Sequence, residues 1–188
     1  AKRDDIAAVS IASRPDCFGP EILDIIKEVS TVKPVWIELG LQTSNEKTAL
    51  LINRGYALGE YDKAMDNLKK LDVHIIVHMI IGLPGETKQD MISTVRYIAD
   101  SGAGGIKLQL LHVLKNTVIE KMYINGEFDV LTFDEYADIL CDCLRALPPD
   151  MVVHRFTGDG PKKILVAPMW SADKKMVLNR LKRIVSEL

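Results

Sequence analysis

The sequence has few cysteines and no long apolar run, and each absence removes a class of protein. Only three cysteines occur among 188 residues, too few and too scattered for a disulfide framework. Cys141 and Cys143 are two positions apart in a helical pattern, so they point to different faces and do not form a ligand pair. No apolar run reaches the ~18 residues needed to span a bilayer, and no signal-peptide pattern opens the chain. A cytoplasmic protein with reduced thiols fits these absences best.

Several catalytic signatures are also missing. The chain has no zinc-ligand spacing, no Ser/His/Asp signature, no Walker loop and no G-x-G-x-x-G. The chain therefore lacks the metal-binding or nucleophilic residues that an ordinary barrel hydrolase needs. A formal net charge of −2 gives no reason to expect a nucleic-acid or membrane surface. Basic residues gather only in 174–183, which we interpret as a solvated helix face.

What remains is the composition of an ordinary globular domain, with 47% hydrophobic and 27% charged residues. The length lies just above that of a typical single domain and is enough to bury roughly 70% of the unfolded surface. The chain begins at Ala1 without Met and reaches a strand-like run by Ile6. We interpret this opening as a cut inside a larger domain.

Apolar strand-like runs alternate with helical periodicity along most of the chain. We expect strands at 6–12, 35–41, 73–81 and 106–114, and helices at 20–30, 44–53, 60–71 and 87–100. The strands are continuous apolar runs, which is typical of a parallel sheet covered by helices. Repeated strand–helix units imply βαβ crossovers, and so an α/β layer or barrel.

Capping residues and apolar stripes add detail to these helices. Ser44 or Asn45 caps the second helix, with Leu50 and Leu51 expected to face inward. After residue 126 the regular strand–helix alternation ends. We expect a helix at 132–146, a strand at 151–156 and a helix at 173–187. In the first of these, Thr132 and Glu135 are expected to form a capping box.

Charged side chains stand near the carboxyl ends of the first two strands, where α/β proteins bind ligands. Arg14 either pairs with a carboxylate or phosphate, or belongs to a surface turn. Glu38 interrupts an apolar strand and must pair or change its pKa if buried. Arg54 suits an anionic group, although a cation completing a helix before Gly55 is the alternative.

Further polar residues follow the later strands. His78 is either a ligand or a satisfied core histidine, and residues 82–85 expose backbone suited to a flat ring or simply form a turn. Lys107 and Gln109 share one face of an apolar strand, which is costly unless that face lines a polar cavity. Residues 154–160 read as a ligand-contacting loop or as a Gly/Asp-rich turn.

Four segments occur in an order that matches a known family. They are SIASRPDC (10–17), WIELGLQTSNEKTALLINRG (36–55), VHMIIGLPGET (77–87) and IKLQLLHVLKNT (106–117). Together they resemble the radical S-adenosylmethionine (radical SAM) superfamily, most closely its YhcC-like and YtqA-like bacterial members. The segment 154–174 is similar to the C-terminal block of that subfamily, so the resemblance covers nearly the whole chain.

The resemblance implies a partial (β/α)6 TIM-like barrel, truncated at its N-terminus, over residues 1–128, with a C-terminal extension over 129–188 packed on it. It also implies a [4Fe–4S] cluster on a C-x3-C-x2-C loop, reduced by a partner such as flavodoxin or ferredoxin. The cluster cleaves S-adenosylmethionine to a 5′-deoxyadenosyl radical, which abstracts hydrogen from an unknown substrate. No C-x3-C-x2-C exists here, so we expect the ligand cysteines only in a full-length parent and an inactive fragment.

The resemblance also implies individual roles. Arg54 would bind the methionyl carboxylate, and Gln42 would lie beside the cofactor. His78 stands where related enzymes often have an acidic ribose ligand. The predicted cofactor-binding set is Arg14, Glu38, Gln42, Arg54, His78, Ile80, Gly82, Leu83 and Pro84. The predicted substrate-binding set is Lys107, Gln109, His112, His154, Arg155 and Asp159. No catalytic residue and no metal ligand are assigned.

Two further expectations concern partners. The exposed barrel edge near 6–12 is a pairing hazard, which makes a homodimer through that edge a hypothesis. The alternative to an enzyme is a non-enzymatic α/β module that keeps a small-molecule or nucleotide pocket. The substrate stays open among RNA, a protein side chain and a metabolite, with anionic or hydrogen-bonding groups favoured.

Overall fold

A five-stranded, wholly parallel sheet organises the chain in the computed structural model, which describes residues 3–158 and 160–188. Asp159, one of the predicted substrate residues, lies outside the described residues. The strand order is β1-β2-β3-β4-β6. The strands are β1 (Val9–Ser13), β2 (Val35–Gln42), β3 (His74–Ile81), β4 (Gly105–Leu110) and β6 (Val152–Arg155). The parallel α/β arrangement expected from the continuous apolar runs is confirmed.

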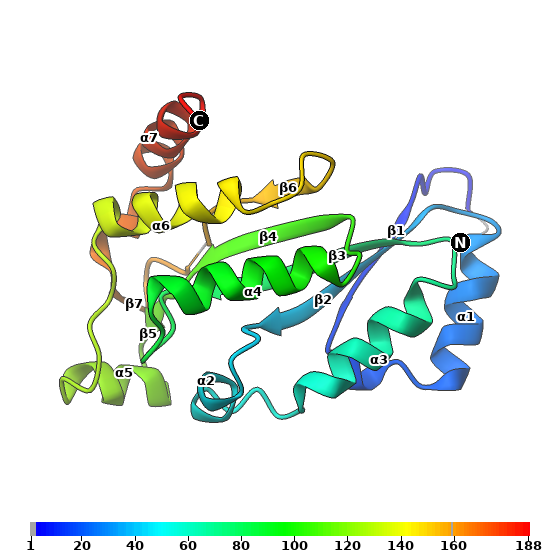
Figure 1. Cartoon of the computed structure of the whole chain (residues 1–188), viewed down its shortest axis with the longest axis horizontal. Helices are drawn as coiled ribbons and strands as arrows, with labels where there is room; N and C mark the ends of the chain where they lie inside the picture. Colours follow the sequence, from blue (N-terminus) through cyan, green and yellow to red (C-terminus); the bar gives the residue numbers. More distant parts are fainter. Residues whose placement is uncertain (1–2, 159) are drawn as a thin grey trace.

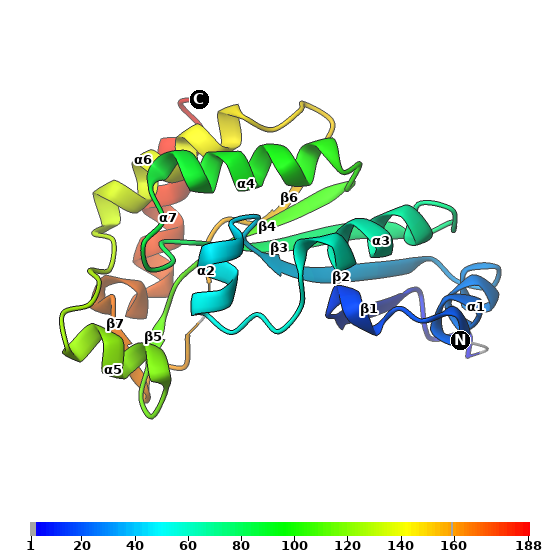
Figure 2. The same cartoon turned by 60° about the horizontal axis from the view of Figure 1, so that its bottom comes forward.

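Helices cover one face of this sheet and leave the other open (Figures 1 and 2). The covering helices are α1 (Pro20–Ser30), α3 (Leu58–Leu68), α4 (Lys88–Asp100) and α6 (Phe133–Arg145). The side chains of β2 alternate between the two faces of the sheet. Ile37, Leu39 and Leu41 are fully buried under the helices. The alternate residues of β2, among them Glu38 and Gln42, are only partly buried on the open face. Side chains alternate across a strand, so this register decides which residues reach the open face.

Local capping explains where the two longest helices begin. Thr87 accepts from the backbone N–H of Asp90, whose carboxylate accepts in return from the Thr87 backbone. Thr132 and Glu135 form the same reciprocal pair at the start of α6, as the sequence predicts. Each capping box satisfies two backbone donors that the first helical turn otherwise leaves unpaired.

The remaining elements surround the open face. Strand β5 (Val113–Leu114) pairs antiparallel with β7 (Leu165–Ala167), apart from the main sheet. The single strand expected over 106–114 is therefore wrong in extent: it ends at Leu110, and the chain then leaves the parallel sheet to meet β7. The other elements are α2 (Glu46–Leu51), α5 (Val118–Ile124), α7 (Lys174–Val185) and the 3-10 turns η1 (Pro15–Cys17) and η2 (Met169–Ala172).

The inward face expected for the second helix is also wrong. Leu50 and Leu51 are 79% and 49% exposed, whereas Thr48 and Ala49 are buried. A helix of six residues makes fewer than two turns, which is too few for its apolar pattern to fix the face that points inward. The Asn45 cap is confirmed, since its side chain accepts from the backbone N–H groups of Lys47 and Thr48.

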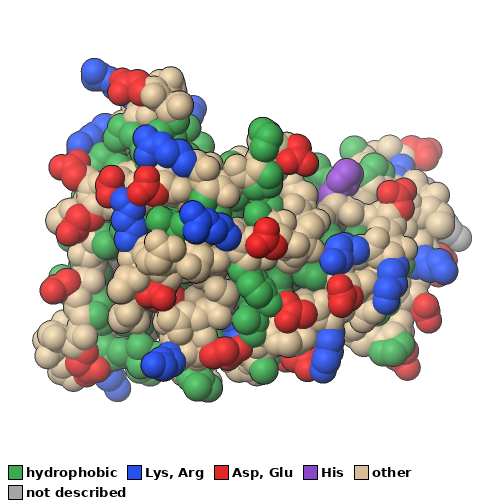
Figure 3. Space-filling model, viewed as in Figure 1, with side chains coloured by type: hydrophobic (Ala, Val, Ile, Leu, Met, Phe, Trp, Pro, Cys, Tyr) green, Lys and Arg blue, Asp and Glu red, His purple; other side chains and the backbone are tan. Residues whose placement is uncertain are grey.

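Acidic and basic side chains are interspersed on the helix-covered face, without a large patch of one sign (Figure 3). Such mixing is usual for a solvated helical surface. Within the described parts of the chain, no helix has the length and apolar character needed to cross a membrane.

Candidate functional site

A cavity of about 590 Å³ opens at the carboxyl ends of β1, β2 and β3, on the face that the helices leave bare. Its volume lies within the range of small-molecule sites. The cavity brings together seven of the nine predicted cofactor-binding residues: Arg14, Glu38, Gln42, Arg54, His78, Ile80 and Leu83. The other two, Gly82 and Pro84, are buried in the turn after β3 and are not among the lining residues. Tyr56, Leu111 and Ile119 also line the cavity.

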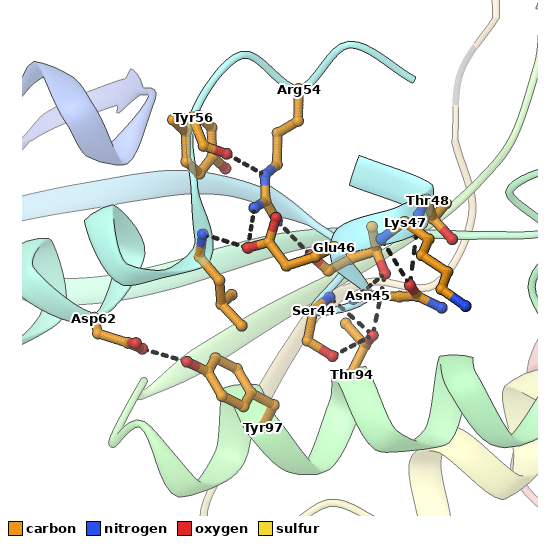
Figure 4. Close-up of polar contacts among 12 residues, drawn as sticks. Ser44, Asn45, Glu46, Lys47, Thr48, Arg54, Tyr56, Asp62, Thr94 and Tyr97 are labelled. Carbon is orange, nitrogen blue, oxygen red and sulfur yellow. Dashed lines mark hydrogen bonds and ion pairs between the residues drawn. The ribbon is translucent and has the colours of Figure 1, made fainter. Parts of the chain in front are cut away.

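The Arg54 guanidinium lies at the back of the cavity and organises the turn after β2. Its side chain is 2% exposed and pairs with Glu46 at 3.1 Å. Nη1 donates to the Thr43 carbonyl at 2.7 Å and Nε to the Tyr56 carbonyl at 3.1 Å (Figure 4). These three contacts leave two of the five guanidinium N–H groups for an external anion. Arg54 thus stabilises the turns on either side of α2, and within the described parts of the chain its side chain makes no hydrogen bond to the last carbonyls of that helix, which the alternative interpretation of its position would require.

Gln42 adopts a left-handed backbone conformation with φ of 69°, which is uncommon outside glycine. Its side chain folds back over Gly40, where an added Cβ would lie 2.8 Å from Nε2. A side chain at position 40 would therefore displace the Gln42 amide from this position. The strand register also shifts between Gly40 and Gln42, and Gln42 lines the cavity.

Tyr56 is a wall residue that sequence reasoning missed. Its ring lies 4.6 Å from the guanidinium carbon of Arg54 and 5.6 Å from that of Arg14, within cation–π range. Its hydroxyl donates to the Gly40 carbonyl, and burial raises the pKa of Tyr56 to about 12, so the phenol keeps its proton. The only sequence signal was an aromatic residue two positions after a candidate cation.

Arg14 lies at the rim of the cavity. It pairs with Asp16 at 2.6 Å and donates to the Gly55 carbonyl at 3.1 Å, and its side chain is half exposed. The guanidinium therefore joins the turn after β1 to the turn after α2. Arg14 belongs to a turn, as one interpretation predicted, and its position on the cavity wall leaves binding of an anionic ligand a prediction.

A polar network crosses the centre of the open face. The Glu38 carboxylate accepts from Lys107 Nζ at 2.5 Å and lies 2.8 Å from His78 Nε2, both through Oε2. Gln109 Nε2 lies 2.9 Å from His78 Nδ1. Burial acts to raise the pKa of Glu38, but hydrogen bonds from Lys107 and His78 outweigh it, and the pKa is lowered. Glu38 is therefore ionised, and Lys107 and Gln109, both predicted to face substrate, are engaged within this network.

His78 is held neutral between two partners. Burial lowers the pKa of His78, and the hydrogen bond to Glu38 only partly opposes that shift. A neutral imidazole has one N–H and one acceptor nitrogen. Because Glu38 is an acceptor, Nε2 carries the proton, and Nδ1 accepts from the Gln109 amide.

The other predicted substrate residues lie around this network. The His154 ring occupies the space over Gly105, where a Cβ would lie 2.7 Å from it, and meets the Trp36 ring edge-on at 5.8 Å. Arg155 is exposed and in register with Lys107. His112 lies farther along, beside glycines 158 and 160. His154 and Arg155 also line a separate cavity of about 190 Å³, so the predicted set is spread over the open face.

Glu86 is a second residue that sequence reasoning missed. It follows β3, yet its Oε1 accepts from the Thr43 hydroxyl, 2.5 Å away in the turn after β2. Thr94 of α4 bonds Ser44 in that same turn, at 3.0 Å between hydroxyls (Figure 4). Glu86 thus ties together the two turns that form the cavity wall. Its only signal in the sequence is a carboxylate directly after the predicted turn 82–85.

Metal ligands are not assembled in the described residues. No group of three or more His, Cys, Asp or Glu side chains there is placed to hold a metal ion. Cys17 is exposed, whereas Cys141 and Cys143 are buried in α6. The residues of this chain therefore do not fit a [4Fe–4S] cluster, which needs several cysteine thiolates.

Comparison with known proteins gives matches over nearly the whole chain. The Radical SAM superfamily model matches residues 1–98, and the Radical_SAM C-terminal domain model matches residues 103–187. The uncharacterized protein YtqA of Bacillus subtilis is 42% identical over 96% of this chain and 56% of its own length. YhcC of Escherichia coli K12 is 29% identical over 97% of this chain and 60% of its own.

A solved structure has the same fold. The archaeal Elp3 of Methanocaldococcus infernus, with an N-terminal deletion, superposes with a TM-score of 0.79 at 20% identity, over 94% of this chain and 42% of that one. The chain therefore spans well under two thirds of the length of these curated relatives.

Proposed function

The chain belongs to the radical S-adenosylmethionine superfamily, and from that premise we propose that its open sheet face forms part of the cofactor and substrate site of a longer enzyme. The main support is the cavity, because it gathers residues predicted separately from three segments of the sequence. In the proposed full-length enzyme, S-adenosylmethionine and a reduced [4Fe–4S] cluster supply a 5′-deoxyadenosyl radical that abstracts hydrogen from substrate. The cluster ligands lie outside this chain.

The cavity walls suit the parts of that cofactor. Ile80, Leu83 and Leu111 provide an apolar wall for the adenine. The remaining N–H groups of Arg54, with Arg14 at the rim, suit the methionyl carboxylate. The work of these residues is to bind and orient the cofactor, and none of them is placed to supply the cluster.

On the open face, Arg155 is a cation that can bind an anionic substrate. Lys107 is neutralised by Glu38, whereas Arg155 has no ion-pair partner within the described parts of the chain and is exposed. An anionic or hydrogen-bonding substrate therefore suits this face best. The proposal also includes cytoplasmic location, a reductant such as flavodoxin or ferredoxin for the full-length enzyme, and a homodimer through the β1 edge.

The proposal is tested by titrating the chain with S-adenosylmethionine and following its amide resonances by NMR. We expect weak saturable binding with shifts around the cavity. Ile80→Glu places a charge against the adenine wall and should abolish binding, whereas Ile164→Glu, at a site 39% exposed, is the matched control. Absence of binding to the folded chain would overturn the cofactor assignment.

The second test concerns the [4Fe–4S] cluster. Reconstitution of the chain with iron and sulfide should yield no stable centre, and the full-length protein should yield one. A stable centre on the chain alone would contradict the placement of the ligands. Release of 5′-deoxyadenosine by the reduced full-length enzyme distinguishes it from the alternative, a non-enzymatic nucleotide-binding module.

A further inference from the structure

We propose that Thr94 and Glu86 are positioning residues for Arg54, because together they hold the peptide whose carbonyl orients the Arg54 guanidinium toward a carboxylate. This inference rests on the proposed function, in which Arg54 binds the methionyl carboxylate. Arg54 lines the cavity, whereas Thr94 and Glu86 are not among its lining residues. Both residues therefore act through Arg54 and not by contact with the ligand.

The N–H groups that Arg54 can offer to a ligand lie on its two terminal nitrogens. Nε donates to the Tyr56 carbonyl, Nη1 to the Thr43 carbonyl and Nη2 to the Glu46 carboxylate. A guanidinium has one N–H on Nε and two on each terminal nitrogen. Within the described parts of the chain, one N–H is therefore left on Nη1 and one on Nη2. Such a pair matches the two oxygens of a carboxylate, which arginine binds in bidentate fashion.

The Thr43 carbonyl is the firmest of the three acceptors. Its contact with Arg54 is 2.7 Å long, compared with 3.1 Å for each of the other two. Thr43 is 0% exposed, whereas the Glu46 side chain is 47% exposed. Exposed side chains change rotamer quickly, whereas a buried carbonyl moves only with its backbone. The orientation of Nη1 therefore depends on what holds the backbone at Thr43.

Thr94 holds the peptide that carries this carbonyl. The Thr43 carbonyl and the Ser44 N–H belong to one peptide unit, which is planar and rigid. The Ser44 N–H donates to Thr94 Oγ1 at 3.1 Å, and the two hydroxyls lie 3.0 Å apart (Figure 4). Holding the N–H on one side of the peptide sets the direction of the carbonyl on the other. Thr94 is 0% exposed on α4, and a buried hydroxyl is costly without a partner of this kind.

Glu86 holds the same turn through the Thr43 side chain. The residue before it, Gln42, has a left-handed φ of 69°, and such a conformation persists only where the surroundings impose it. The Thr43 hydroxyl accepts from the Asn45 N–H at 3.0 Å, a contact inside the turn, and donates to Glu86 Oε1 at 2.5 Å. The second contact joins the turn to a residue 43 positions later. Thr94 and Glu86 thus restrain one peptide from two different elements.

The experiment compares two ligands that differ by the carboxylate. The chain is titrated with S-adenosylmethionine and with decarboxylated S-adenosylmethionine, and dissociation constants are measured by NMR. We expect the wild-type chain to bind the first about tenfold or more tightly, as for hydrogen bonds between charged groups. Thr94→Val removes the hydroxyl and leaves a side chain of similar volume. In this variant the preference should fall to about threefold or less, while the affinity for the decarboxylated ligand stays within about twofold.

Conservative variants separate positioning from packing. Thr94→Ser keeps the hydroxyl and should retain the preference. Ser44→Ala removes only the Ser44 hydroxyl and keeps the backbone N–H that Thr94 holds, so it is the matched control and should also retain it. Glu86→Ala should lower the preference, whereas Glu86→Gln keeps an acceptor for Thr43 and should not. The two Glu86 variants decide the matter if Thr94→Val does not fold.

A readout without ligand is the resonance of the Arg54 Nε–H group. It should shift in Thr94→Val and Glu86→Ala, because the guanidinium is reoriented, and stay in place in Ser44→Ala.

Four results would overturn the inference. The preference could survive in both Thr94→Val and Glu86→Ala, which would leave the proposed function standing. Both ligands could lose affinity equally in these variants, which would show a purely structural role. Ser44→Ala could lose as much preference as Thr94→Val, which would show that any change in the turn has this effect. Finally, S-adenosylmethionine could fail to bind the folded wild-type chain, which would overturn the proposed function and this inference with it.

Discussion

Single charged residues on the open face have roles that depend on their neighbours. Lys107 was predicted to face substrate, yet its ammonium lies 2.5 Å from the Glu38 carboxylate. Arg54 was predicted to bind an anion, and most of its donors hold the turn after β2. A partly buried ion is stable only when paired. The pairs therefore decide which charges stay available to a ligand.

Glu86 provides a pH-dependent test at this scale. Burial raises the pKa of its carboxyl, against the hydrogen bonds from Thr43 and Thr48, and Oε2 is buried with no partner among the described atoms. A raised pKa means that the folded state holds the proton more tightly than the unfolded state. Its contribution to stability is therefore fully present below the unfolded pKa and lost as pH rises through the folded pKa.

We therefore expect Glu86→Gln to gain stability relative to wild type as pH rises from 4 to 7, by about 1 kcal/mol. Urea unfolding at several pH values measures this difference. Glu60→Gln is the matched control, since the Glu60 side chain is 41% exposed on α3. A Glu86→Gln difference that shrinks with rising pH would contradict the assignment.

Helices of similar apolar composition pack differently according to their length. The 11-residue α3 buries Tyr61, Ala64, Met65 and Leu68 along one stripe, as its periodicity predicts. The six-residue α2 is too short to define such a stripe, and the side that it buries carries Thr48 and Ala49.

Two leucine truncations test this contrast between elements. Leu68→Ala in α3 removes a side chain with 0% exposure and should cost about 2–5 kcal/mol in the free energy of unfolding. Leu50→Ala in α2, at 79% exposure, should change it by less than about 0.5 kcal/mol. Denaturant unfolding of both variants measures the difference. Equal costs would show that Leu50 is packed in solution.

The whole molecule has an exposed sheet edge at β1. Among the described strands β1 pairs with β2 alone, and the Val9 N–H donates toward that side, to the Pro34 carbonyl. Backbone donors alternate along a strand, so the Ser10 N–H points to the free edge. An unpaired edge of this kind is a template for pairing with another chain.

We expect a concentration-dependent dimer that Ser10→Pro weakens, because proline removes the outward donor without removing a bond to β2. Ser10→Ala keeps that donor and should dimerise as wild type does. Light scattering across a concentration series gives the mass of each. A wild-type chain that stays monomeric at high concentration would end the edge hypothesis.

The sequence by itself was sufficient for the parallel α/β fold, the family, the capping boxes and most strands and helices. Those features depend on local periodicity and on residues close in the chain, such as Thr132 and Glu135. It also predicted seven of the residues that line the cavity, most of them near the carboxyl ends of predicted strands, and missed others such as Tyr56. The register of the sheet then placed those residues on one face.

Only the tertiary structure decided how those residues are used. Glu38 and Lys107 are 69 positions apart, and Thr43 and Glu86 are 43 apart. No local pattern predicts which partner a charge meets across three strands, or that Tyr56 stacks on Arg54. Pairing energies depend on distance and burial, which exist only once the chain has folded. For that reason the sequence predicted polar residues that line the cavity, whereas the pairing of Glu38 with Lys107 and His78 became visible only in the structure.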